Sequence, residues 1–284
     1  MSQPFTVACV QNRASADMSE SLAECEALCR EAASGGADLV CLPEYCSCVS
    51  LDQDRRMELG AHEARSHPAL AAFTALTREL KLWLVIGSLA VKAGAGMVCN
   101  RSYVLGPDGR VVAQYDKIHL FDVDLAHGEF YRESDSIAPG DRAVVASTPW
   151  GALGLSVCYD LRFPQLYRAL AQAGAEFITV PAAFTRTTGE AHWHVLNRAR
   201  AIETGSFVFA PCQYGTHGVA ETFGHSLIVD PWGTVLADGG TGPGVIFAEV
   251  DPAAVTKART MIPSLGHDRP FKPPAGDPLK QKSA

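Results

Sequence analysis

The sequence of 284 residues predicts a mixed α/β protein, a four-layer αββα sandwich, on three observations. Short apolar runs typical of buried strands alternate with helical patterns from the first residues onward. Strands outnumber helices, and helices separate many of them, which favours helix layers outside the sheets. A weak internal repeat relates "GADLVCLPE" (36–44) to "GAEFITVPA" (174–182), and both copies end a buried strand near a proline. Two similar halves would each supply one sheet with its helices.

In the first half, helical periodicity and apolar runs alternate in a regular order. The predicted strands are 5–11, 37–44, 82–91 and the two arms of a hairpin within 100–117. The predicted helices are 17–36, which ends at Gly35-Gly36, and 67–80, which starts at His67-Pro68. The hairpin is predicted because Pro107-Asp108-Gly109 is a turn sequence between two strand-like runs.

The second half repeats this alternation and then adds strands. The predicted helices are 164–174 and 190–204. The predicted strands are 151–158, 175–181, 206–213, 224–230, 233–239 and 244–250. "GGTGPG" (239–244) is interpreted as a turn and not a phosphate loop, because a strand and not a helix follows it. The tail after about Ser264, rich in Pro and Lys, is expected to be an arm rather than a core element.

Composition and charge exclude several classes of function. Hydrophobic residues make up 47% and charged residues 19% of the sequence, a composition typical of soluble globular proteins. The net charge of −7, without a basic block, argues against a nucleic-acid surface. No apolar run approaches the ~20 residues needed to span a bilayer. The N-terminal "MSQPFTVACVQN" lacks the features of a signal peptide, so we expect a cytoplasmic location.

The cysteines do not form a disulfide or zinc pattern. There are nine of them, an odd number, with no C-x-x-C pair. Free thiols in a reducing compartment are the simplest interpretation of most of them.

Three polar residues follow predicted strands, where reactive groups gather in open α/β sheets. They are Glu44 after "LVCLP", Lys117 after "VVAQYD" and Cys158 after "LGLSV". A carboxylate can take the proton of a thiol, and an ammonium can stabilise an oxyanion. A helix is predicted soon after Cys158, and its N-terminus is expected to lower the pKa of the thiol. The residues alone leave open a buried inert thiol, a solvated turn carboxylate and a surface ion pair.

Longer motifs around these residues resemble a known family. "LPEYC" around Glu44, "YDKIHLFD" around Lys117 and "VCYDLRFPQLYRAL" around Cys158 are similar to the signature segments of the carbon–nitrogen hydrolase (nitrilase) superfamily. The similarity extends over roughly residues 5 to 270. It implies the αββα sandwich of the nitrilase type, with residues 1–270 as a carbon–nitrogen hydrolase domain and 271–284 as a C-terminal arm.

The resemblance also implies roles for individual residues. Glu44 would be the general base, Cys158 the nucleophile that forms a thioester, and Lys117 with the N–H of Tyr159 the oxyanion holder. It implies no metal and no organic cofactor, and a homodimer or larger homo-oligomer.

A second glutamate orients the triad in this family, and "HGEFYRESD" offers two candidates. The match to the family segment favours Glu133, and we expect Glu129 to be an ordinary loop carboxylate.

Further segments resemble one branch of the superfamily. "TGEAHWHVLNRARAIET" (188–204) and "FGHSLIVDPWGTVLA" (223–237) are similar to the branch of deaminated-glutathione amidases and omega-amidases. The implied substrate is a small acidic amide, the primary amide of a 2-oxo acid, with deaminated glutathione favoured over 2-oxoglutaramate or 2-oxosuccinamate. Arg162 and Arg186 are candidates to bind it. His194 departs from the "HWE" usual in the family.

Other interpretations are less favoured. His192 and His194, two residues apart on a helix, would point about 200° apart and could not share a metal ion there. "GLSVC" is not the G-x-S-x-G elbow of a serine hydrolase. More distant alternatives are an N-carbamoyl amide hydrolase, a nitrilase, and a non-catalytic interaction protein on the same sandwich.

Overall fold

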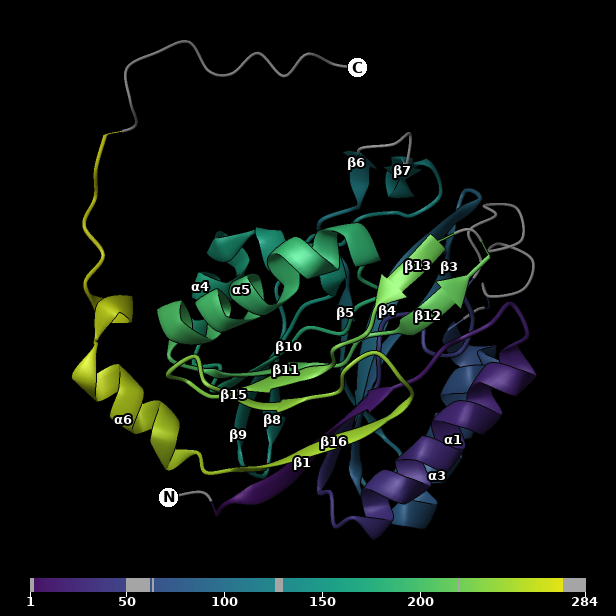
Figure 1. Ribbon diagram of the computed structural model, residues 1–284, viewed down its shortest axis with the longest axis horizontal. Coiled ribbons are helices and arrows are strands. Elements are labelled where there is room, and N and C mark those ends of the chain that lie inside the picture. Colours follow the sequence, from purple (N-terminus) through teal and green to yellow (C-terminus); the bar gives the residue numbers. More distant parts are fainter. Residues whose placement is uncertain (1–2, 50–61, 63, 126–129, 219, 273–284) are drawn as a thin grey trace.

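The computed structural model confirms a sandwich of two six-stranded sheets between layers of helices (Figure 1). It describes residues 3–49, 62, 64–125, 130–218 and 220–272. The first sheet has the order β16 (Gly244–Val250), β1 (Phe5–Gln11), β2 (Leu39–Cys41), β3 (Trp83–Gly94), β4 (Met97–Leu105), β5 (Val111–Asp116). The second has the order β15 (Val235–Asp238), β14 (Leu227–Val229), β11 (Phe207–Ala210), β10 (Phe177–Thr179), β9 (Gly151–Leu155), β8 (Val145–Thr148).

The internal repeat corresponds to matching positions in the two sheets. β2 and β10, which lie within the two repeat copies, are each the middle one of three parallel strands. In the first sheet, β1 pairs antiparallel with the edge strand β16, and β3 pairs antiparallel with β4, which pairs with β5. In the second sheet, β9 pairs antiparallel with the edge strand β8, and β11 pairs antiparallel with β14, which pairs with β15. The two sheets therefore share one arrangement of strands. The prediction that each half supplies one whole sheet is wrong for β16, which comes from the end of the second half and pairs with β1 in the first sheet.

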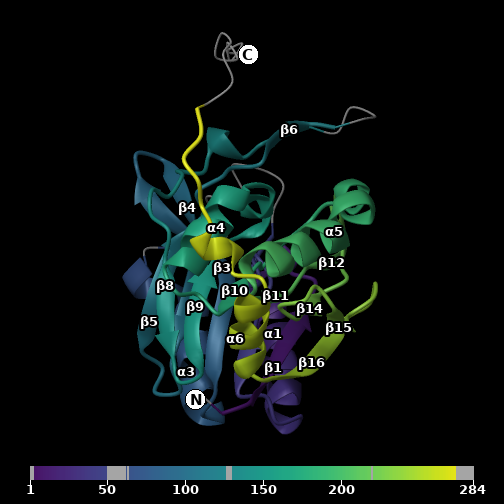
Figure 2. The ribbon, with the colours of Figure 1, turned by 90° about the vertical axis from the view of Figure 1, so that its left-hand side faces the viewer.

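The helices cover the outer faces of the sheets. They are α1 (Met18–Ser34), α3 (Pro68–Leu80), α4 (Pro164–Gln172) and α5 (Arg186–Thr204). A further helix, α6 (Ala253–Met261), contacts the backbone of Thr204 and Ala175 through Arg259. Figure 1 shows α1 and α3 on one side of the molecule and α4 and α5 on the other, with the sheets between them. α6 lies at the left of Figure 1 and faces the viewer in Figure 2. No helix in the described part of the chain is long and apolar enough to cross a membrane.

Strand β1 explains why the predicted strands read as continuous apolar runs. Its side chains alternate in direction, so Val7 and Cys9 join the core between the sheets while Ala8 and Val10 pack under α1 and α3. Both faces of the strand are therefore buried, which favours apolar side chains on both, and the buried polar exception is Gln11 at its end.

Most predicted elements are confirmed, and the differences have local causes. Strands β2, β10 and β11 are shorter than predicted, because the chain leaves the sheet before Pro43, Pro181 and Pro211. Helix α5 begins at Arg186 rather than at residue 190. The segment 239–244 is a turn whose carbonyl groups, not its N–H groups, converge on the side chain of Gln11. That arrangement is unsuited to phosphate.

The sequence missed several smaller elements. They are strand β8, helix α6, the hairpins β6–β7 (Asp122–Asp124, Phe130–Arg132) and β12–β13 (Tyr214–His217, Ala220–Phe223), and the 3₁₀ turns η2 (Ala64–Ser66), η4 (Glu133–Asp135), η5 (Cys158–Arg162) and η6 (Ser264–Gly266). The tail after Ser264 is partly attached, since Arg168 and Gln172 of α4 both bind the carboxylate of Asp268. Of the predicted arm 271–284, Phe271 and Lys272 are exposed. Residues 273–284 lie outside the described residues.

Gly87 in β3 lies against the backbone of Leu42 and Pro43, directly after β2. A Cβ at this position would lie 2.1 Å from the carbonyl oxygen of Leu42 and 2.2 Å from that of Pro43. We expect Gly87→Ala to lower the free energy of unfolding by about 2 kcal/mol or more, as measured by urea denaturation. Gly242→Ala is the matched control, because nothing lies within 4 Å of its Cβ. Equal stability of the two variants would contradict this packing.

Candidate active site

The structure brings the three predicted strand-end residues together from both sheets. Glu44 lies three residues after β2, Lys117 directly after β5, and Cys158 three residues after β9. The Nζ atom of Lys117 is 3.0 Å from Oε1 of Glu44. The charges of Glu44 and Lys117 both act on the Cys158 thiol. The ends of strands from two sheets thus form one polar cluster in the interior.

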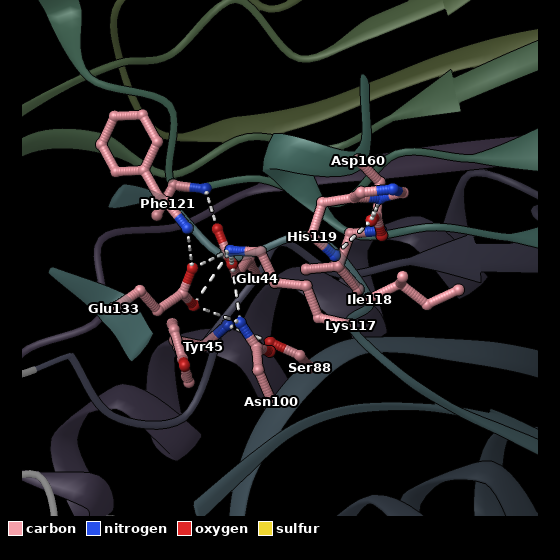
Figure 3. A network of polar contacts seen from close by, with 12 residues as sticks. Glu44, Tyr45, Ser88, Asn100, Lys117, Ile118, His119, Phe121, Glu133 and Asp160 are labelled. Atoms are coloured by element: carbon pink, nitrogen blue, oxygen red, sulfur yellow. Dashed lines mark hydrogen bonds and ion pairs between the residues drawn. The ribbon is translucent and has the colours of Figure 1, made fainter. Parts of the chain in front are cut away.

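Glu133, at the start of η4, completes this cluster (Figure 3). Lys117 donates hydrogen bonds to both of its carboxylate oxygens, at 3.0 and 2.8 Å. Exposed fractions of 3% for Glu44, 2% for Lys117 and 8% for Glu133 make this a buried ion triple. The alternative candidate, Glu129, lies outside the described residues.

The ammonium of Lys117 stays charged despite its burial. Desolvation alone would lower the pKa of Lys117, but the carboxylates of Glu133 and Glu44 outweigh it and raise that pKa well above its usual value. The site therefore holds a permanent cation between two carboxylates.

Three neutral hydrogen-bond donors, which were not predicted from the sequence, hold the two carboxylates in place. The Nδ2 atom of Asn100 donates to Oε1 of Glu44 at 2.8 Å and to Oε1 of Glu133 at 3.4 Å. The backbone N–H of Ala183 donates to Oε2 of Glu44 at 2.9 Å, and that of Phe121 donates to Oε2 of Glu133 at 2.7 Å. The sequence gives no distinct signal for Asn100, because it stands in β4 beside two other polar residues, Arg101 and Ser102.

The thiol of Cys158 is held in a strained turn. Its φ of +48° is unusual for a residue other than glycine, and its backbone N–H donates to the carbonyl of Pro181 at 2.9 Å. Burial raises the pKa of the Cys158 thiol well above its usual value, the negative charge of Glu44 adds to this, and Lys117 opposes it. At neutral pH the resting group is therefore a thiol.

This direction corrects the expected lowering of that pKa by a following helix. Cys158 begins the five-residue 3₁₀ turn η5, and α4 begins only at Pro164. A single short turn has only a small dipole, so the pKa of the Cys158 thiol is determined mainly by burial and by the nearby carboxylates.

Asp160 connects the turn that carries Cys158 to the segment around Lys117. This buried carboxylate accepts hydrogen bonds from the hydroxyl of Tyr115 at 2.7 Å and from the N–H of Val157 at 2.9 Å. It also binds His119, through the backbone N–H at 3.1 Å and Nδ1 at 2.7 Å. One side chain thus fixes the relative position of two chain segments that carry site residues.

The remaining predicted site residues differ in their surroundings. No acceptor within the described ranges pairs with the N–H of Tyr159. The guanidinium of Arg162 lies over the rings of Phe184 and Tyr159, at 5.4 and 5.9 Å, and its polar side-chain partner in the described part of the chain is His192, not a carboxylate. Arg186 is more than half exposed and already pairs with Glu190 and Glu221. Arg162 is the better placed of the two arginines.

The two histidines of α5 have separate partners. Nδ1 of His192 lies 3.4 Å from the guanidinium of Arg162, whereas Nε2 of His194 lies 3.0 Å from Oδ2 of Asp238. As predicted from their spacing, the two rings do not share one site.

Asn100→Asp tests the balance of charge around Lys117. The new carboxylate would be repelled by Glu44 and Glu133, and this repulsion would raise the pKa of the introduced Asp in the folded state. The folded state would then bind more protons than the unfolded state, so stability would fall as the pH rises. We expect the loss of unfolding free energy to grow from pH 5 to pH 8, reaching about 3 kcal/mol. Urea denaturation at both pH values measures it.

The matched control for this substitution is Asn100→Ala. It removes the same amide without adding a charge, so its destabilisation should be nearly the same at both pH values. If Asn100→Asp lowered the free energy of unfolding by the same amount at pH 5 and pH 8, the described charge balance would be contradicted.

Comparison with known proteins agrees with this geometry. The chain matches the carbon–nitrogen hydrolase family over residues 6–260. It is 38% identical to a deaminated glutathione amidase of Synechocystis over 93% of this chain and 98% of that protein. It is 41% identical to the human deaminated glutathione amidase over 93% of this chain and 82% of that one.

A solved structure supports the same assignment. The NitFhit protein of C. elegans superposes with a TM-score of 0.88 at 33% identity, covering 95% of this chain and 66% of that chain. Extensive matches in both sequence and fold place this chain in the carbon–nitrogen hydrolase family, as a hydrolase that acts on amides.

Proposed function

We propose that this protein is an amidase that hydrolyses the primary amide of a small 2-oxo acid, with deaminated glutathione as the favoured substrate. The observation that carries the proposal is the buried ion triple of Glu44, Lys117 and Glu133 beside the Cys158 thiol. Buried charges are costly, and such clusters of perturbed groups mark functional sites.

In the first half-reaction, Cys158 is the nucleophile and Glu44 the base. Because the resting thiol is protonated, Glu44 takes its proton as sulfur attacks the amide carbon. Lys117 and the N–H of Tyr159 hold the oxyanion of the tetrahedral intermediate. Glu44 then gives the proton to the amide nitrogen, the C–N bond breaks, and ammonia leaves a thioester on Cys158.

In the second half-reaction, water replaces ammonia. Glu44 takes a proton from the water, whose oxygen attacks the thioester carbon, and the same donors hold the second oxyanion. The C–S bond breaks, Glu44 returns the proton to the sulfur, and the carboxylic acid departs. Glu133 positions Lys117 through two hydrogen bonds and Phe121 fixes Glu133, so the ammonium need not reorganise.

Arg162 supports an acidic substrate. Its guanidinium lies over two aromatic rings and has His192, not a carboxylate, as its polar side-chain partner among the described residues, so a substrate carboxylate can pair with it. The names of the Synechocystis and human relatives favour deaminated glutathione over the shorter 2-oxo acid amides. An omega-amidase acting on 2-oxoglutaramate or 2-oxosuccinamate is the second candidate.

We further propose a cytoplasmic location and a homo-oligomer. All nine cysteines are free, which suits a reducing compartment. Large apolar side chains exposed on α5, on α6 and around β14–β15 would be covered by a second copy, with molar mass in solution as the test. They are Val195, Ile202, Trp232, Leu236, Met261 and Ile262.

The proposed function predicts ammonia release from deaminated glutathione, with a higher kcat/KM than from 2-oxoglutaramate. Cys158→Ala should fold normally by circular dichroism and release no ammonia, because it lacks the nucleophile. A preference for 2-oxoglutaramate would identify the omega-amidase instead. Substantial turnover by Cys158→Ala would overturn the mechanism.

A second prediction concerns the substrate's charge. Arg162→Met should raise KM for deaminated glutathione by at least tenfold, because it removes the charge-assisted contact, while kcat falls less. Arg186→Met is the matched control, since Arg186 already has two carboxylate partners, and its KM should stay close to wild type. Equal effects of the two substitutions would contradict the assignment of Arg162.

A further inference from the structure

His194, His225 and Asp238 form a second polar cluster, on elements that carry none of the residues of the proposed triad. His194 lies on α5, His225 precedes β14, and Asp238 ends β15. The carboxylate of Asp238 bridges the two rings, with Oδ2 at 3.0 Å from Nε2 of His194 and Oδ1 at 2.8 Å from Nδ1 of His225. The three side chains together present two imidazole nitrogens and a carboxylate, all within 4.8 Å of one another.

Neighbouring contacts hold these groups in place. The backbone of His225 is fixed on both sides, because its N–H donates to the carbonyl of Gly240 at 2.6 Å and its carbonyl accepts from Nε1 of Trp193 at 2.7 Å. The ring of His225 stacks on Phe223 at 4.5 Å. The N–H of Gly240 also donates to Oδ1 of Asp238, at 2.9 Å. Such contacts orient the ligands in metal sites.

The backbone at His225 is strained as well. Its φ of +52° lies in the left-handed region, which costs energy for a residue other than glycine. The strain directs the imidazole toward Asp238 and His194.

The spacing suits a small cation. Two ligand atoms about 2.1 Å from an ion lie about 3.4 Å apart in a tetrahedral site. The two nitrogen–oxygen pairs, now hydrogen-bonded at 3.0 and 2.8 Å, need to move apart by only a few tenths of an ångström to hold an ion. Two imidazoles with one carboxylate favour zinc, nickel, cobalt or copper over magnesium and calcium. We propose that His194, His225 and Asp238 bind one divalent transition-metal cation, with water in the remaining positions.

Binding also requires a change of tautomer. Each ring now places a nitrogen toward Asp238, and a metal ion there would move that N–H proton to the other ring nitrogen of a neutral histidine. The ion would then link α5 to β14 and β15 and stabilise their packing. The spacing of His192 and His194 excluded a site shared by that pair, but His194 finds its partners 31 and 44 residues further along the chain.

Cobalt titration of the full chain tests this proposal. The protein carries Cys158→Ala, to remove the nucleophilic thiol, and is first stripped with a chelator. We expect one equivalent of Co²⁺ to bind with visible absorption bands but without a thiolate charge-transfer band. Zinc at about 100 times its Kd should raise the Tm by about 4 °C.

Three substitutions complete the test. Asp238→Asn and His194→Gln should each weaken cobalt binding at least tenfold, because each removes a ligand. His192→Gln, two residues away on α5, is the matched control and should bind as tightly as the parent. The proposal would be overturned by no binding up to millimolar cobalt, by a thiolate band, or by undiminished binding in either ligand variant.

Discussion

The buried ammonium of Lys117 is the constraint on which the rest of the site depends. A charge in the protein interior is tolerated only when it is paired and hydrogen-bonded, and removing a single partner leaves an uncompensated charge. Here two carboxylates surround one ammonium, and Asn100, Ala183 and Phe121 hold the carboxylates in turn. The two sheets must therefore keep a fixed relation for the cluster to exist, and the core between them provides it.

The repeat explains how two similar halves make a single site. Glu44 ends the first copy and Ala182 occupies the equivalent position in the second. The N–H of Ala183, the next residue, donates to Glu44, and the carbonyl of Pro181 accepts from the N–H of Cys158. The second copy thus contributes its backbone where the first contributes a side chain.

Much of this was predictable from sequence, for physical reasons. Strands buried on both faces give unbroken apolar runs, and polar residues after them are conspicuous, which is why Glu44 and Cys158 could be selected. Lys117 follows the largely exposed strand β5, so its selection depended on the family motif around it. Helix α6 and the small hairpins were missed because their patterns are short. Asn100 and Asp160 act through contacts between distant segments, and His194 meets Asp238 only in the folded chain. The pKa of Cys158 was predicted in the wrong direction, because a short 3₁₀ turn and not a helix begins at this residue, and because the sequence left its burial open.

The central claim is that Cys158 carries the acyl group between the two half-reactions. The most direct measurement is mass spectrometry of the protein quenched in acid during turnover of an amide substrate, followed by digestion to locate the added mass. We predict an adduct equal to the substrate's acyl group on the peptide that contains Cys158. Turnover without an adduct, or an adduct on another residue, would contradict the account.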